Sequence, residues 1–168
     1  MKYSKLFVVL IVGSFLTFTA CAVSEERVLE LAQESFAEKM AQEPKPQTYI
    51  TDELAMYVPS YTKVNEIDDY NLILERDGHI FLLFLNDFVE YGDREDVLEE
   101  LMIEEEPFIL EMKKNGDEVG YFVVTEQPDG EFTIVVGYDG VKITTITDLS
   151  NINNIAEMMF DIVHSVTK

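Results

Sequence analysis

Apolar residues between positions 54 and 146 come in short runs with the spacing of β-strands. In residues 131–138 a wholly apolar set (Phe132, Ile134, Val136 and Tyr138) alternates with a mixed one (Glu131, Thr133, Val135 and Gly137), which is typical of a half-buried strand. Residues 80–85 and 121–124 are apolar throughout, as in strands covered on both sides. The runs are separated by Asp77-Gly78, Asn115-Gly116, Asp129-Gly130 and Asp139-Gly140. Because such dipeptides favour tight hairpin turns, we predict a single antiparallel meander of about seven or eight strands.

Segments in which apolar residues have helical spacing lie before and after this β-rich region. Apolar residues recur every three or four positions over residues 28–40 and again over 152–166. Ser24 is placed to cap the first helix, and Pro44 and Pro46 end it. The predicted fold class is therefore α+β, with an N-terminal helix and a C-terminal helix packed on the sheet. We expect the C-terminal helix to cover one sheet face. The second face is covered by the N-terminal helix or else forms a groove for a lipid, a hydrophobic peptide or a partner protein.

The first 21 residues have the layout of a secretory signal peptide. Lys2 and Lys5 precede an apolar stretch over residues 6–16, which is too short to span a membrane. The stretch Phe18-Thr19-Ala20-Cys21 follows, and it resembles the lipobox of bacterial lipoproteins, although Phe18 stands where that family usually has an aliphatic residue. The resemblance implies cleavage before Cys21 and lipidation of its thiol. The chain would then be held on the extracytoplasmic face of the cell membrane.

Two other fates of this segment remain open. Ala20-Cys21-Ala22 also fits an ordinary signal peptidase site, which would release a secreted protein. The segment could instead stay uncleaved as an anchor. On the lipoprotein interpretation, residues 1–20 are the cleaved signal, residues 21–47 hold the anchor, first helix and proline-containing connector, and residues 48–168 form the α+β domain.

Charge narrows the possible partners. The 168 residues include 33 Asp or Glu and 12 Lys or Arg, a net charge of −21, and removal of residues 1–20 leaves −23. This balance argues against nucleic-acid binding, which requires clustered basic residues. The acidic residues are interpreted as a solvated surface, with a cation or basic-peptide binder as the alternative. The most acidic stretch, residues 93–106, predicts a short surface helix and lacks the spacing of a calcium loop.

Catalytic motifs are missing from the sequence. No G-x-S-x-G or phosphate-binding glycine motif occurs, and the single cysteine excludes a multi-cysteine metal site. We interpret His79 as a strand residue after a turn and His164 as a residue near a helix C-terminus. We therefore predict no catalytic residue, no metal and no cofactor. A pair of carboxylates brought together by folding leaves a hydrolase as a distant third possibility.

The mature chain resembles small sheet-plus-helix domains of lipoproteins from Gram-positive bacteria, many without an assigned function. The residues that carry this resemblance are Tyr57-Val58-Pro59-Ser60-Tyr61, Gly137-Tyr138-Asp139-Gly140 and His164-Ser165-Val166. The resemblance implies no site residues. The leading hypothesis is a membrane-anchored, non-enzymatic lipoprotein that binds or supports a protein partner. The alternative is a carrier or sensor of a small hydrophobic ligand held between sheet and helix.

Overall fold

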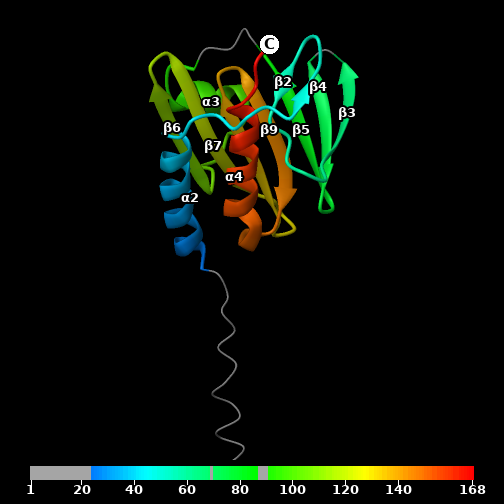
Figure 1. Ribbon diagram of the computed structural model, residues 1–168. Coiled ribbons are helices and arrows are strands. Elements are labelled where there is room, and N and C mark those ends of the chain that lie inside the picture. Colours follow the sequence, from blue (N-terminus) through cyan, green and yellow to red (C-terminus); the bar gives the residue numbers. More distant parts are fainter. Residues whose placement is uncertain (1–23, 69, 87–90) are drawn as a thin grey trace, which may run out of the picture.

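A computed structural model describes residues 24–68, 70–86 and 91–168. Cys21 and the rest of the lipobox-like segment lie outside the described residues. The chain folds into a seven-stranded sheet with helices on both faces, so the α+β class is confirmed (Figure 1). The strands of this sheet are β3 (Lys63–Asp68), β4 (Asn71–Arg76), β5 (His79–Leu85), β6 (Ile109–Asn115), β7 (Glu118–Glu126), β8 (Phe132–Tyr138) and β9 (Val141–Thr147).

The strand order is β3-β4-β5-β9-β8-β7-β6, and every neighbouring pair is antiparallel. The prediction of a single meander is therefore wrong. Two meanders, β3–β5 and β6–β9, are joined through β5 and β9, where Leu82 pairs with Thr144. Residues 86–108 connect β5 to β6 at the far edge of the sheet. Because this connection is long, β5 and β6 are consecutive in sequence without being neighbours in the sheet.

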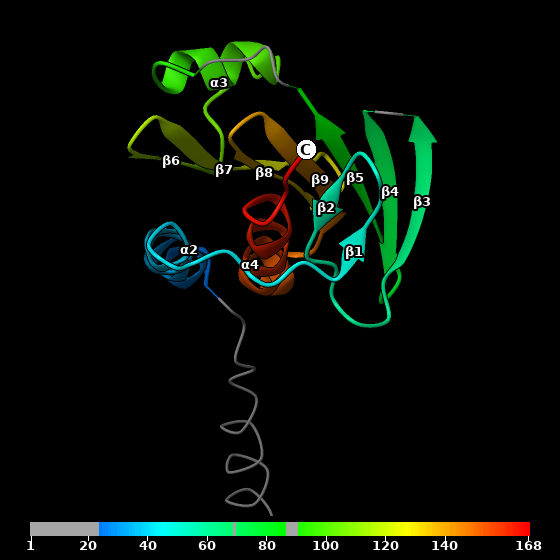
Figure 2. The same cartoon turned by 45° about the horizontal axis from the view of Figure 1, so that its top comes forward.

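A separate two-stranded sheet is formed by β1 (Tyr49–Ile50) and β2 (Ala55–Met56). Ala55 and Thr167 exchange two backbone hydrogen bonds of 2.9 Å, which fix the C-terminus beside β2. Met56 is fully buried in the main core. The segment thus covers part of the β3–β5 half of the sheet (Figure 2).

Two of the predicted Asp-Gly turns have the backbone conformation that tight hairpins require. Asp77 and Gly78, like Asp139 and Gly140, all have positive φ, from 44° to 84°. Two consecutive residues with positive φ define the type I′ hairpin turn, whose twist matches that of the flanking strands. These two dipeptides therefore fix the β4–β5 and β8–β9 pairings.

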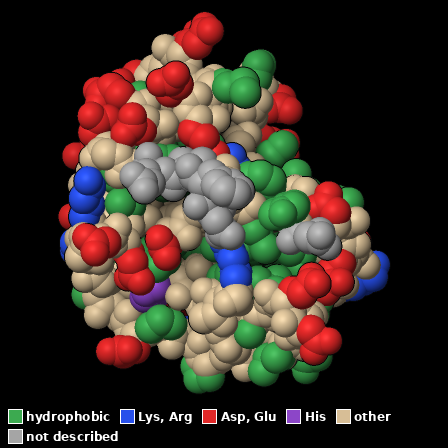
Figure 3. Space-filling view, turned by 90° about the horizontal axis from the view of Figure 1, so that it is seen from above, with side chains coloured by type: hydrophobic (Ala, Val, Ile, Leu, Met, Phe, Trp, Pro, Cys, Tyr) green, Lys and Arg blue, Asp and Glu red, His purple; other side chains and the backbone are tan. Residues whose placement is uncertain are grey.

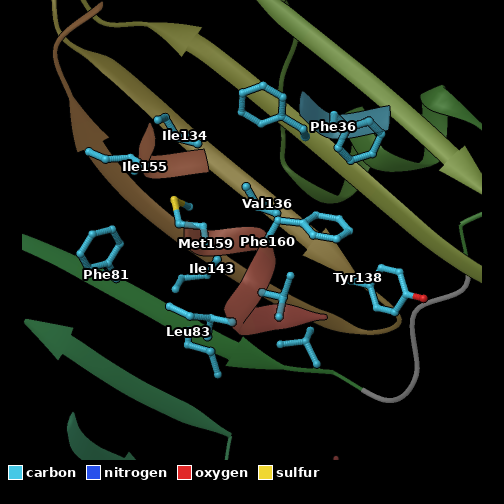
Figure 4. Packing of buried hydrophobic residues seen from close by; sticks show 14 of the residues in the cluster. Phe36, Phe81, Leu83, Ile134, Val136, Tyr138, Ile143, Ile155, Met159 and Phe160 are labelled. Carbon is cyan, nitrogen blue, oxygen red and sulfur yellow. The ribbon is translucent and has the colours of Figure 1, made fainter. Parts of the chain in front are cut away.

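Helices α2 (Glu25–Lys39) and α4 (Ile152–Val163) lie side by side on one sheet face (Figures 1 and 2). Ser24 caps α2 as predicted, accepting a hydrogen bond from the Arg27 amide at 3.3 Å. Met159 and Phe160 of α4 point toward the strands, and the Phe160 ring meets Phe36 of α2 edge to face at 5.9 Å (Figure 4). The expectation that the N-terminal helix covers the second face is wrong, because the broad apolar stripe of α4 packs against α2 as well as the sheet.

Candidate functional site: the bare sheet face

Among the described residues, the segments that cover the second face of the sheet lie over its β6–β8 half. Helix α3 (Arg94–Glu100) and the segments flanking it pack there on side chains of β6, β7 and β8 (Figure 2). Val97 of α3 is completely buried against Tyr121, Val123 and Val135. This short helix is the one that the acidic stretch predicts: Val97 faces the sheet, and Glu95, Asp96 and Glu99 are exposed, whereas Glu100 is half-buried.

The β4, β5 and β9 half of the same face carries a contiguous group of aliphatic and aromatic side chains, here called the bare face. Its members are Ile73, Ile80, Leu82, Phe84 and Ile146. Ile80, Leu82 and Ile146 are 61%, 52% and 51% exposed, whereas Ile73 and Phe84 are half-buried.

Strand register brings these residues together. Ile73 of β4 pairs with Leu82 of β5, and Leu82 pairs in turn with Thr144 of β9. Ile80, two residues before Leu82 in β5, and Ile146, two residues after Thr144 in β9, lie on the same face. Side chains opposite one another on neighbouring strands have Cβ atoms about 4.5–5.5 Å apart, so the group forms one continuous surface.

A polar network anchors α3 at the border of the bare face. The Tyr91 hydroxyl donates to Glu100 at 2.6 Å and lies 3.3 Å from the Tyr121 hydroxyl. Lys142 of β9 donates to the other oxygen of Glu100 at 2.5 Å. Burial is the main cause that raises the pKa of both tyrosines well above the usual range. The two hydroxyls therefore stay protonated and serve as structural donors.

Acidic residues end the strands at one side of the bare face. Asp77 lies in the β4–β5 turn, Glu131 precedes β8 and Asp148 follows β9, so the antiparallel order places all three at the same end of the sheet. All three are exposed. Within the face itself, Glu75 is paired with Lys63 at 3.4 Å. At the opposite end of the sheet, acidic side chains are spread over the surface rather than gathered in one place (Figure 3).

The two histidines do not form a common site, because His79 begins β5 and His164 follows the last residue of α4. His79 Nδ1 is 3.2 Å from the carbonyl oxygen of Ile146. His164 meets the Tyr138 ring edge to face and the Phe160 ring at a tilt, with centroids 4.5 and 5.2 Å away, and burial lowers the pKa of His164. Among the residues that the structure describes, no group of three or more His, Cys, Asp and Glu side chains is placed to hold a metal ion.

Space for a small hydrophobic ligand is scarce between the sheet and helices α2 and α4. The cavity found there has a volume of about 20 Å³ and is lined by Phe36, Phe122 and Phe160 among others. A single water molecule occupies a space of this order, whereas a lipid or drug-sized ligand needs several hundred Å³. The interior below the helices is therefore filled by side chains.

Comparison with known proteins leaves the chain without an assigned relative: no family model matches it, and no curated protein matches it. Within the described part of the chain, no helix has the length and apolar character required to cross a bilayer.

Proposed function

We propose that this chain is a lipid-anchored, non-enzymatic protein of the extracytoplasmic membrane surface that binds a protein partner through the bare face. The partner presents an aliphatic centre surrounded by basic residues. The observation that carries the proposal is the exposure of Ile80, Leu82 and Ile146 side by side on a regular sheet, next to a half that α3 covers. Contiguous exposed apolar surface of this kind marks interaction sites in soluble domains.

The energetics support docking at this surface. Full burial of an Ile or Leu side chain contributes about 1.5–3 kcal/mol, so burying the exposed half of one contributes about 1 kcal/mol. Ile80, Leu82 and Ile146 together thus offer about 3 kcal/mol to a complementary partner. Sheet faces are rigid, which limits the conformational entropy lost on association.

Charge determines the kind of partner. The chain has a net charge of −21, and −23 without residues 1–20, so two copies repel one another. Asp77, Glu131 and Asp148 at the end of the bare face attract cations to its rim. A partner with basic residues around an aliphatic patch gains from both features, because complementary charge speeds association and excludes acidic competitors.

The anchor is tested by metabolic labelling. Cells expressing the full chain are fed a labelled fatty acid, and the protein is recovered and analysed. The proposal expects label on the wild type and none on Cys21→Ser. Equal labelling of both proteins, or of neither, would refute lipidation at Cys21.

The docking surface is tested by photo-crosslinking in intact cells. A photoreactive amino acid replaces Leu82, or replaces Ile50 as a control, since Ile50 is 71% exposed but lies in the small β1–β2 sheet. The proposal expects a discrete adduct when the photoreactive residue is at position 82 and none when it is at position 50. Ile80→Asp should abolish this adduct, and rising salt should weaken it. The same adduct at both positions, no adduct, or an adduct with a second copy of the chain would overturn it.

A further inference from the structure

An open groove of about 830 Å³ runs along α4, and Lys39 at the end of α2 also lines it. Its opposite wall is the segment of residues 57–61, and the β4–β5 turn with Asp77 and His79 closes one end. Phe81, Ile155 and Met158 supply apolar surface in it. This groove lies on the face that carries the helices, so it is separate from the bare face.

The ring of Tyr61 stands at this groove and is 98% exposed. Its backbone has φ +65°, in a turn closed by the hydrogen bond from the Thr62 amide to the Pro59 carbonyl at 3.2 Å. Left-handed backbone at this turn position is normally occupied by glycine or asparagine, and a bulky residue there is strained. Strain retained at an exposed aromatic residue points to a role in contacting a ligand.

The neighbouring hairpin holds the turn in place. The Arg76 guanidinium donates to the Ser60 carbonyl at 2.8 Å through Nη1 and pairs with Asp77 at 3.0 Å through Nε. Pro59 is buried. The position of the Tyr61 backbone is therefore set before any ligand arrives.

Charges lining the groove balance one another, although the whole chain is strongly acidic. Lys39 and Lys45 both contact Asp161 at 2.6 Å, and Lys45 also lies 4.9 Å from the centre of the Tyr57 ring. Arg76 pairs with Asp77. The remaining acid, Glu157, accepts a hydrogen bond from Ser35 at 2.7 Å. An uncharged ligand meets little repulsion here, whereas a polyanion is repelled by the net charge of −21.

We propose that this groove binds an uncharged oligosaccharide, with one sugar ring stacked on Tyr61. Aromatic rings offer a flat apolar surface to the C–H face of a sugar, and the groove carries Asn, Arg, Asp and Glu side chains that can pair with hydroxyl groups as donors and acceptors. A peptide ligand is disfavoured because the groove is open and lacks an enclosed pocket for an anchoring side chain.

The probe is the uncharged tetramer of N-acetylglucosamine, titrated into the purified full chain in detergent and followed by NMR. Tyr61→Gly removes the ring and relieves the backbone strain. The matched control is Met102→Gly, because Met102 has a similar φ of +54° and is 88% exposed, yet lies after α3 on the other face of the sheet. Tyr61→Phe retains the ring.

We expect Tyr61→Gly to weaken binding about tenfold, Tyr61→Phe to stay within about threefold, and Met102→Gly to leave affinity unchanged. The unfolding midpoint of both glycine variants rises, which separates lost binding from misfolding. Absence of binding by the wild type, unchanged affinity in Tyr61→Gly, or Tyr61-dependent binding of a tetralysine peptide in place of the saccharide would overturn the proposal. Leu82→Glu on the bare face should leave saccharide binding intact. Failure of the saccharide proposal can therefore be distinguished from failure of the protein-partner proposal.

Discussion

Gly137 of β8 allows the Tyr121 ring of the neighbouring strand to lie directly over the backbone. A Cβ atom built at Gly137 would lie 2.1 Å from Cζ of Tyr121 and 2.6 Å from its hydroxyl oxygen. The ring has no free space to enter, because Tyr121 is 1% exposed and its hydroxyl contacts Tyr91. Gly137→Ala must therefore push the ring and the polar network beneath α3 out of place.

The cost follows from three contributions. Overpacking a core by one methyl group typically costs about 1–3 kcal/mol. Loss of the Tyr121–Tyr91 hydrogen bond adds about 1 kcal/mol, and the conformational gain of replacing glycine in a strand returns about 0.5–1 kcal/mol. We expect Gly137→Ala to lower the free energy of unfolding by about 2 kcal/mol.

Gly120 of β7 provides a matched comparison. Its Cβ would lie 2.3 Å from Sδ of Met40, the end of a flexible side chain that can rotate away. We expect Gly120→Ala to change the free energy of unfolding by less than about 1 kcal/mol. Urea denaturation followed by circular dichroism compares both variants with the wild type. Equal midpoints for the two variants would refute the reasoning, since it rests on the difference between a fixed ring and a movable thioether.

Three further outcomes are expected. Met159→Asp places an unpaired charge in the core and should lower the free energy of unfolding by about 3 kcal/mol or more, whereas Met102→Asp at an exposed site should change thermal melting little. Burial lowers the pKa of His164, so the stability that the neutral imidazole contributes is full above pH 6.5 and is lost as the pH falls below that value. The free energy of unfolding of His164→Asn should therefore fall less between pH 7 and pH 5 than that of the wild type. Sodium chloride should raise the denaturant midpoint by screening carboxylate repulsion, and calcium chloride at matched ionic strength should add little; a large extra effect of calcium would reveal an ion site.

Elements specified by local chemistry could be predicted from the sequence. Ser24 caps α2, and the Asp77-Gly78 and Asp139-Gly140 turns make hairpins because their backbone requirements are met by two adjacent residues. The strand order could not be predicted in the same way. The β5–β9 pairing joins Leu82 to Thr144, 62 positions apart, and many apolar runs of similar composition could have served as partner.

The coverage of the second sheet face was only partly predictable. The run of residues 80–85 is apolar at every position, which indicates that both faces are covered, yet Ile80 and Leu82 are more than half exposed. Burial depends on where α3 lies, and that is fixed by contacts of Val97 and Glu100 with residues distant in sequence. The sequence also lacks any signal for the left-handed backbone at Tyr61, because no glycine or asparagine occupies that turn.

The parallel course of α2 and α4 bears on how the domain would be oriented if it is anchored at Cys21 as proposed. Both helices begin at the sheet end that holds the Asp77-Gly78 and Asp129-Gly130 turns, and the C-terminus lies at the opposite end (Figure 1). With Cys21 as the proposed anchor, Ser24 is three residues away, a tether of at most about 10 Å. On the proposed anchoring, the strands would stand upright on the bilayer with the bare face directed sideways. A partner held in the same membrane would meet this face by lateral diffusion, in two dimensions instead of three.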